Sequence, residues 1–594
     1  MEELKTRKEM DPRYLWHLED MIPSDEAYDS LENETRERLK AFKSLEGHVK
    51  DDPAKAVKDY FAFSLPAEKC YVFASMRRDE DGAEPSAQAR FARAQQLSAD
   101  CATAASFLEP ELLALPEETL KALTEDPQMR DYDSYLKSLM RFKPHSLSAE
   151  EEKLMALSSD PLNVSSDAFG MLDNVDLPMP EVLCEDGSRQ KLSQGLYSMN
   201  LRSRSREVRA EALQGMLGAF KGFRSTISTL YAGAVKADLF RTRARKFPSC
   251  LEAALFHEEI PTEVYNGLLS AVEEALPHLN RYLALRKKVL HVESLHMYDL
   301  YVPIVDEFDL KLSYEEAFDL VIKALAPLGS EYTDKLKEAR SSGWVDVFEN
   351  KNKRGGAYSW GCYGTHPYVL LNFTGNLDGA STLAHELGHA MHSFYSDANQ
   401  SYAKAQYSLF VAEVASTCNE VLLSRYLMNE YRDDRKAQAF FCNQLLESFR
   451  TTVFRQTMFA AFEKRSHEMA ENGEPLTADS LSDMYLNLNR LYYGGVCDVD
   501  EAIASEWMRI PHFYRNFYVY KYATGFSAAV AIADRILREG ETAVKDYKRF
   551  LSAGGSVPPI EALRYAGVDM ADPATVKNAL NVFGETVEQM EKLL

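Results

Sequence analysis

The sequence predicts a mainly α-helical protein, because helical spacing of apolar residues fills two long regions separated by a segment rich in Ser, Asp and Pro. Over most of residues 1–150, charged and apolar side chains alternate at helical spacing, and Pro and Gly fall largely at the breaks. Beyond residue 200 the spacing resumes, for example over residues 264–276, until Pro277, which we expect to end or kink that helix.

The segment between the two helical regions marks a change of organisation. Ser, Asp and Pro replace the helical pattern across residues 158–190, and Asp186-Gly187 stands between apolar-containing flanks, which is a hairpin signal. We therefore expect an N-terminal helical lobe over residues 1–195, with a short hairpin or linker near 158–195, and a second, mostly helical body over residues 196–594.

Residues 353–379 depart from the helical pattern. They contain six glycines and a short apolar run, Tyr368 to Phe373, bounded by Pro and Gly. This composition predicts turns and at least one strand. The strand is a candidate for pairing with an extended peptide through main-chain hydrogen bonds, and Gly361 and Gly364 either allow a close approach or serve ordinary turns.

The composition excludes several classes of function. The chain has 68 Lys and Arg against 91 Asp and Glu, a net charge of −23, so its field repels phosphate backbones and anionic lipid headgroups. Nucleic acids and membranes are therefore not expected partners. Scattered cysteines without a CxxC pair, an N-terminus without the apolar core of a signal peptide, and no apolar run of about 18 residues predict a reduced, cytoplasmic protein.

The motif that carries chemistry is STLAHELGHAMHSFYS, in which His385, Glu386 and His389 form H-E-x-x-H in a helix-compatible segment. Because the α-helix has 3.6 residues per turn, the two histidines lie about one turn apart on one face, where both imidazoles can reach one zinc ion. Glu386 sits beside them, near the metal-bound water, and its carboxylate can take the proton of that water and pass it to the leaving amine. The spacing therefore predicts a catalytic zinc ion and peptide hydrolysis.

A catalytic zinc needs a third protein ligand and an open position. The metzincin pattern fails, because it needs Gly and His where the chain has His392 and Tyr395. The stretch SLFVAEVASTCNEVLLSRYL offers Glu413 and Glu420 on one helix face, and either could ligate while the other orients a ligating imidazole. Spacing alone leaves that choice open. His392 is a rival ligand, although packing or hydrogen bonding on its own helix is its expected role.

Several segments together resemble one family. HELGHAMH with the E-x-x-S of residues 413–416 is similar to the thimet oligopeptidase-type metallopeptidases, and LEAALFHEEIPTEVYNGL, HMYDLYVP, PYVLLNFTGN and HFYRNFYVYKYATG resemble the oligoendopeptidase F branch. The opening YLWHLEDMIPSDEAY is similar too, so the resemblance covers nearly the whole chain.

This resemblance carries implications for the site and the fold. It implies that Glu413 is the third zinc ligand and that Glu420 orients His385 or His389. It makes residues 196–594 the zinc metallopeptidase catalytic region. It also implies a two-lobed helical ellipsoid that encloses a deep channel, with the zinc at its floor, a small β-sheet beside it and folded proteins excluded.

The same family uses a late cluster of Tyr and His to hydrogen-bond the substrate carbonyl oxygen as it becomes an oxyanion. The resemblance places that cluster in IPHFYRNFYVYKYATG, which holds His512, Tyr514, Tyr518, Tyr520 and Tyr522. Tyrosine hydroxyls stay protonated donors at neutral pH, although any single one could equally be a packing residue. His512 and Tyr520 are the first candidates, with Tyr514 and Tyr518 as alternates.

We therefore expect a cytoplasmic zinc endopeptidase, with one zinc ion per chain, that cleaves internal bonds of short unstructured peptides. A zinc exopeptidase or peptidyl-dipeptidase is an alternative that would need a basic group placed to bind a substrate terminus. A catalytically silent peptide-binding scaffold is a second alternative, against which the intact H-E-x-x-H argues. A purely structural zinc would close its coordination with four protein ligands and leave Glu386 without a task. The oligomeric state does not follow from the sequence.

Overall fold

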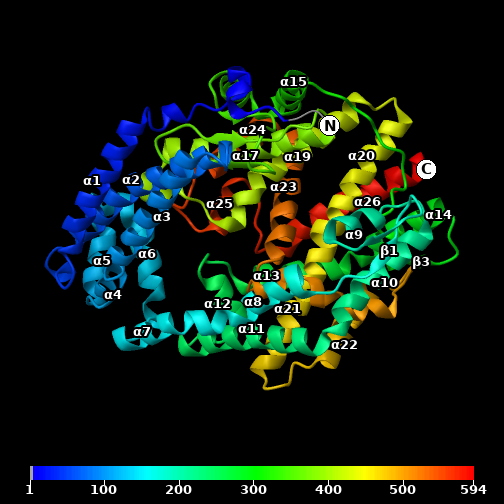
Figure 1. Cartoon of the computed structure of the whole chain (residues 1–594), viewed down its shortest axis with the longest axis horizontal. Coiled ribbons are helices and arrows are strands. Elements are labelled where there is room, and N and C mark those ends of the chain that lie inside the picture. Colours follow the sequence, from blue (N-terminus) through cyan, green and yellow to red (C-terminus); the bar gives the residue numbers. More distant parts are fainter. Residues whose placement is uncertain (1–3) are drawn as a thin grey trace. The chain divides into compact units, whose positions relative to one another are not determined.

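The computed structural model of the chain describes residues 4–594 (Figure 1). These residues group into two compact units. Unit 1 comprises the described residues up to Ser146, Asp309–Leu427 and Ala529–Val568, and unit 2 comprises Leu147–Phe308, Met428–Ala528 and Asp569–Leu594. Both units are mainly helical, so the predicted fold class is confirmed. The domain boundary near residue 195 stays a prediction. Among the described residues, no helix is long and apolar enough to span a membrane.

The N-terminal part of unit 1 is a group of helices (Figure 1) that pack around a mainly aliphatic core with some aromatic rings in it. Ser24 and Asp52 cap α1 and α2 by accepting hydrogen bonds from N–H groups of the first turn, which the helix itself cannot satisfy. The core joins Phe73 to Tyr368 and Leu370, so these helices share their packing with a strand of unit 1. The helices are α1 (Asp25–Lys43), α2 (Pro53–Glu80), α3 (Pro85–Ala105), α4 (Leu108–Leu113), α5 (Glu117–Glu125) and α6 (Asp133–Phe142).

The remainder of unit 1 contains the H-E-x-x-H motif, which lies in a helix as predicted. That helix, α17 (Leu377–Asn399), packs against α15, α24 and a small sheet. The other helices are α15 (Tyr314–Ala324), α16 (Ser330–Ser341), α18 (Tyr402–Ala405), α24 (Glu541–Leu551) and α25 (Pro559–Tyr565). Two helices continue from one unit into the other, α19 (Leu409–Glu430) and α23 (Tyr520–Glu539).

The sheet of unit 1 has three strands in the order β4 (Val345–Asp346), β6 (Tyr368–Leu370), β5 (Tyr358–Trp360). The predicted strand is confirmed as β6, which is parallel to β4 and antiparallel to β5. Because β6 is paired on both sides, the prediction that it pairs with an extended peptide is wrong: its backbone groups are already used. The outer strands of this sheet are β4 and β5. Beside β4, Val347 donates its N–H to the carbonyl oxygen of Tyr14, whereas within residues 4–594 no backbone hydrogen bond is found on the outer side of β5. Gly364 has φ +82° and so serves a turn.

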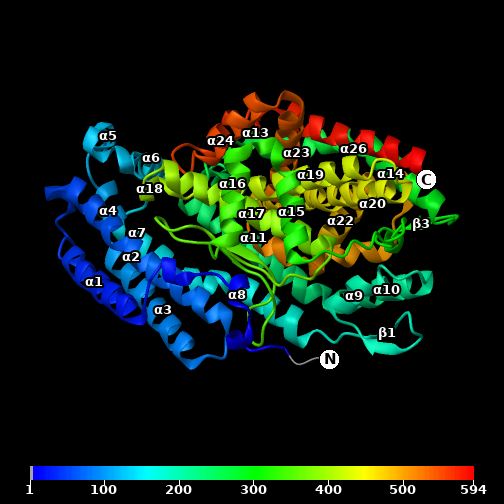
Figure 2. The same ribbon diagram turned by 90° about the horizontal axis from the view of Figure 1, so that it is seen from above.

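Unit 2 is built mainly from long helices, and Figure 2 shows the C-terminal α26 lying along α20 and α14. Its helices are α7 (Ala149–Leu157), α8 (Ser159–Met171), α9 (Gln194–Asn200), α10 (Arg206–Gly222), α11 (Arg224–Ala244), α12 (Cys250–Phe256), α13 (Thr262–Glu274), α14 (Leu276–Val289), α20 (Arg435–Ser448), α21 (Arg455–Glu471), α22 (Ala478–Tyr493) and α26 (Pro573–Leu593). Strand β3 (Leu295–His296) pairs in parallel with β7 (Cys497–Asp498).

The segment 158–190 differs in part from its predicted form. The predicted loss of the helical pattern does not hold in its first half, which forms helix α8. Pro161 is compatible with this helix because it falls in the first turn, where a missing N–H costs nothing. The predicted hairpin is confirmed: β1 (Glu181–Leu183) pairs antiparallel with β2 (Arg189–Lys191) around Gly187, which has φ +81°. Pro277 also acts as predicted, since α13 ends before it and α14 starts anew with it in the first turn.

Candidate active site

Helices α17 and α19 of unit 1 bring the predicted metal ligands together. His385 and His389 lie one turn apart on α17, with their Nε2 atoms 3.2 Å apart. Glu413, near the start of α19, places Oε2 3.4 Å from Nε2 of His385 and 3.5 Å from Nε2 of His389. One ligand atom from each of the three residues thus faces a common centre, where a metal ion could lie.

The cluster fits a zinc ion in both spacing and chemistry. Tetrahedral bonds of about 2.0 to 2.1 Å place ligand atoms about 3.3 Å from one another, which matches the three distances. Two imidazole nitrogens and one carboxylate oxygen are also a ligand set that catalytic zinc sites use. The side chains of His385, His389 and Glu413 are 25%, 17% and 52% exposed, so solvent reaches the cluster.

The close crossing of α17 and α19 depends on Gly388, which stands inside the motif. A Cβ atom there would lie 2.5 Å from Cα of Ser416 on α19. Ser416 also donates a hydrogen bond from Oγ to Oε2 of Glu413 at 3.1 Å. Asn419 donates from Nδ2 to the carbonyl oxygen of Ala384 at 3.0 Å and so ties α19 to the turn before His385. Asn419 was not predicted, because nothing in its spacing distinguishes it from other residues of the stretch.

Glu420 faces the imidazole of His385, with Oε1 3.3 Å from Nδ1. Nε2 of His385 faces the other two ligand atoms, so Glu420 contacts the second ring nitrogen, Nδ1, which does not face the proposed metal position. Burial on its own would lower the pKa of His385, but the hydrogen bond to Glu420 and the nearby carboxylates raise it to about 9. Conversely, a hydrogen bond from His389 lowers the pKa of Glu413 to about 2, although burial opposes this shift.

Glu386 is buried beside the cluster, at 7% exposure. Burial raises the pKa of its carboxyl group above the usual range, and the charges of His385 and His389 oppose part of that rise. A carboxyl group with a raised pKa is better matched to proton transfer near neutral pH than an exposed one.

His392 is not part of the cluster. It is 1% exposed, and its ring stacks on Tyr407 with centroids 3.7 Å apart and on the side of Phe550. Burial lowers the pKa of His392 to about 3, so the imidazole is neutral. The expected packing role is therefore confirmed, and its rival role as a ligand finds no support in the geometry.

The predicted oxyanion residues lie in unit 2. Tyr522 places its hydroxyl 3.5 Å from Nε2 of His512, and its ring is edge-on to Tyr518 with centroids 5.4 Å apart. These three side chains are partly exposed. Tyr520 is fully buried against Tyr265, whereas Tyr514 stacks on Phe169 with centroids 4.3 Å apart. The structure thus groups His512 with Tyr518 and Tyr522, and places the other two tyrosines in packing positions.

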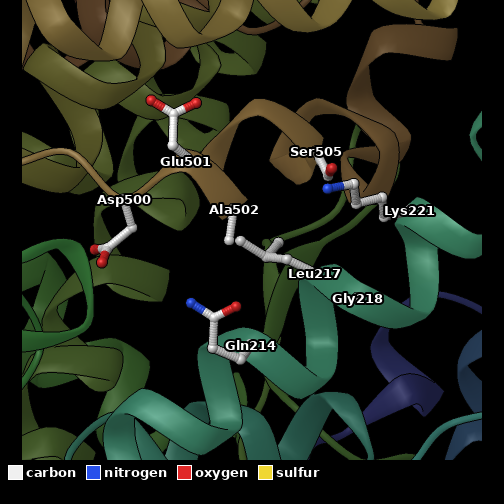
Figure 3. Close-up of a pocket in the computed structure, with 8 residues that line it drawn as sticks. All are labelled: Gln214, Leu217, Gly218, Lys221, Asp500, Glu501, Ala502 and Ser505. Atoms are coloured by element: carbon white, nitrogen blue, oxygen red, sulfur yellow. The ribbon is translucent and has the colours of Figure 1, made fainter.

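A hollow of about 310 Å³ lies elsewhere in unit 2, between α10 and the 3₁₀-helix Glu501–Arg509 (Figure 3). Both of its carboxylates are engaged, Glu501 with Arg490 at 2.6 Å and Asp500 with His296 at 2.9 Å. None of the predicted site residues lines this hollow. Its lining residues are Gln214, Leu217, Gly218, Lys221, Asp500, Glu501, Ala502 and Ser505.

This protein combines a mainly helical fold with a His–His–Glu cluster on two crossing helices. These features place it in the class of metallopeptidases. The comparisons with known proteins agree: the sequence profile of Peptidase family M3 matches residues 199–582, and that of Oligopeptidase F matches residues 111–178. The chain belongs to peptidase family M3, and the predicted resemblance is confirmed.

Similar proteins cover the chain over its whole length. Oligopeptidase PepF of Bacillus subtilis is 42% identical over 100% of this chain and 89% of its own length. Group B oligopeptidase PepB of Streptococcus agalactiae is 37% identical over 99% of this chain and 98% of its own. The crystal structure of oligoendopeptidase-F from Enterococcus faecium superposes with a TM-score of 0.74 at 35% identity, over 96% of this chain and 99% of that chain.

Proposed function

We propose that this protein is a zinc-dependent endopeptidase of short, unstructured peptides, with one zinc ion held by His385, His389 and Glu413. The observation that carries the proposal is the cluster of three ligand atoms in a member of the M3 family. A zinc ion in this position supplies positive charge that polarises the substrate carbonyl and makes water more acidic. By analogy with the oligopeptidases that it resembles, the substrate is a peptide. The proposed cytoplasmic location rests on the scattered cysteines, which favour a reducing compartment.

In this proposal Glu386 moves the proton. Its carboxylate oxygen takes a proton from the attacking water, and the resulting acid delivers that proton to the leaving nitrogen. The burial of Glu386 favours the protonated form between the two steps. Glu420 acts through His385: by accepting the hydrogen bond from Nδ1, it keeps Nε2 as the unprotonated ligand atom.

The His–Tyr group of unit 2 supplies hydrogen bonds to the substrate oxyanion in this proposal. Its support is the resemblance together with the partial exposure of His512, Tyr518 and Tyr522, because a donor must reach the substrate. Burial lowers the pKa of His512, and Arg515 lowers it further, so the ring is neutral near pH 7. We rank Tyr522 and Tyr518 before Tyr514 and Tyr520, since the latter two are engaged in packing.

The edge strand β5 is the proposed contact for the main chain of the substrate. Val369 donates its N–H to Trp344 on the β4 side, so the Ser359–Val369 pair exchanges no hydrogen bonds. The N–H and C=O groups of Ser359 therefore point away from β6, toward the open edge. An extended peptide can pair there through its backbone, which makes recognition tolerant of sequence.

Removal and return of the metal test the proposal. Chelation should abolish cleavage of an internally quenched peptide blocked at both ends, and about one equivalent of zinc should restore it. Cleavage of free-ended peptides only, at a fixed distance from one end, would favour an exopeptidase or peptidyl-dipeptidase. Binding without cleavage in the zinc-loaded protein would favour a peptide-binding scaffold.

A further inference from the structure

The carboxyl group of Glu463 has no part in the function proposed above. Glu463 lies on α21 in unit 2, and its side chain is 0% exposed. Its Oε1 accepts a hydrogen bond of 2.6 Å from the backbone N–H of Phe517. Its Oε2 has no hydrogen-bond partner within the described part of the chain. The polar contact of this buried carboxyl group is therefore with the turn at Phe517.

Phe517 has a backbone conformation that needs support. Its φ angle is +47°, in the left-handed region that bulky side chains rarely adopt. Its ring is buried, edge-on to Tyr265 with centroids 5.6 Å apart and against His467 with centroids 4.6 Å apart. The hydrogen bond to Glu463 and these ring contacts together hold a turn that the residue type disfavours.

The turn separates the two parts of the His–Tyr group. His512 precedes it, in the 3₁₀-helix Pro511–Tyr514, whereas Tyr518 and Tyr522 follow it. The hydroxyl of Tyr522 meets Nε2 of His512 across the turn at 3.5 Å. The direction of the chain at Phe517 therefore sets how these side chains lie relative to one another.

The surroundings keep this carboxyl group neutral. Burial raises the pKa of Glu463 well above its usual range, the N–H of Phe517 opposes the rise, and the charge of Asp238 adds to it. Asp238 itself faces Nε2 of His467 at 3.3 Å. A neutral acid accepts the N–H of Phe517 through its carbonyl oxygen, as a glutamine amide would.

We propose that Glu463 is a positioning residue, whose acceptor oxygen fixes the left-handed turn at Phe517 and thereby sets His512 against Tyr518 and Tyr522. Glu463 acts through this turn and not on the substrate. The inference rests on the proposed function of the His–Tyr group.

Substitutions of Glu463 in the full-length, zinc-loaded protein test the inference, with kcat and KM measured on the blocked quenched peptide. Glu463→Leu removes the acceptor, so kcat should fall about tenfold or more while KM changes less than about twofold and zinc content stays the same. Glu463→Gln keeps the acceptor and should retain kcat within about twofold. Thr457→Val is the matched control, because Thr457 is equally buried on α21, and it should leave both constants unchanged.

A second substitution probes the turn itself. Glycine accepts positive φ without strain, so Glu463→Leu should cost less kcat in a Phe517→Gly background than in the wild type. An unchanged kcat in Glu463→Leu, or an equal loss in the Gln and Leu variants, would overturn the inference. If Glu463→Leu does not fold, Glu463→Asn takes its place, because it withdraws the acceptor by one carbon.

Two further variants separate this inference from the proposed function. His512→Ala and Tyr522→Phe should each lower kcat and keep zinc. If both retain the wild-type kcat, the role of the His–Tyr group fails, and the inference about Glu463 fails with it. If both lose kcat while Glu463→Leu does not, only the inference about Glu463 is wrong.

Discussion

Gly388 of α17 lies directly against the backbone of Ser416 on α19. A Cβ atom on residue 388 would stand 2.5 Å from Cα of Ser416 and 2.7 Å from the carbonyl oxygen of Ala415. These are backbone atoms, so no side-chain rotation can relieve the clash. Glu413 lies one turn earlier on α19, so the glycine of the motif sets the distance between the two helices that carry the proposed ligands.

Gly388→Ala should therefore weaken zinc binding without removing a ligand. The added methyl group pushes α19 away, and we expect zinc affinity to fall about tenfold or more and stability by about 1 to 3 kcal/mol. Competition with a chromophoric chelator and thermal unfolding measure the two effects. Gly218→Ala on α10 is the control, because nothing lies within 4 Å of its Cβ position, and it should not destabilise the protein. Unchanged zinc affinity in Gly388→Ala would contradict this account.

Glu420→Gln tests the orientation of His385. The amide no longer carries the negative charge that faces Nδ1, so we expect zinc affinity to fall by about 10- to 100-fold while the substrate KM of zinc-saturated protein changes little. Glu338→Gln on α16 serves as the control, since the side chain of Glu338 is 51% exposed and pairs with Lys335 on the same helix. A wild-type affinity in Glu420→Gln would remove Glu420 from its proposed role.

Zinc binding to chelator-treated protein should release close to one proton at pH 7.5. Burial opposes the rise, but Glu420 raises the pKa of His385 to about 9, so the imidazole is protonated at this pH and must lose its proton to ligate. In the metal-free protein, the pairing of protonated His385 with Glu420 stabilises the folded state. Because the folded pKa is above the ordinary value of about 6.5, this stabilisation is fully present below pH 6.5 and is lost as pH rises through 9. Calorimetry in buffers of different ionisation enthalpy counts the protons, and no buffer dependence would contradict the assignment.

Ser359→Pro should impair substrate binding at the edge of the sheet. Proline removes the N–H that points to the open edge but fits an edge strand, and loss of one main-chain hydrogen bond should raise KM about tenfold. Ser359→Ala keeps that N–H and should behave like the wild type. Equal constants in the two variants would show that β5 does not bind the substrate.

The sequence predicts contacts between residues close together in the chain better than contacts between distant segments. His385 and His389 share one helix, so their spacing alone was enough to predict that they meet. The approach of Glu413 depends on how α19 crosses α17, and only the resemblance selected it over Glu420. The pairing of Tyr368–Leu370 on both sides could not be predicted, because β4 and β5 are very short and carry little strand signal. The sequence also could not predict that Tyr520 is buried while Tyr522 is partly exposed, because this difference depends on which face of α23 packs against the rest of unit 2.

The most direct measurement of the central claim compares wild type with Glu386→Gln. Zinc content is measured on both purified proteins, together with cleavage of an internally quenched peptide that is blocked at both ends. We predict about one zinc per chain in both, with internal cleavage by the wild type only, because the amide cannot take the proton of the attacking water. Near-normal cleavage by Glu386→Gln, or wild-type protein that binds no zinc, would contradict the proposed function.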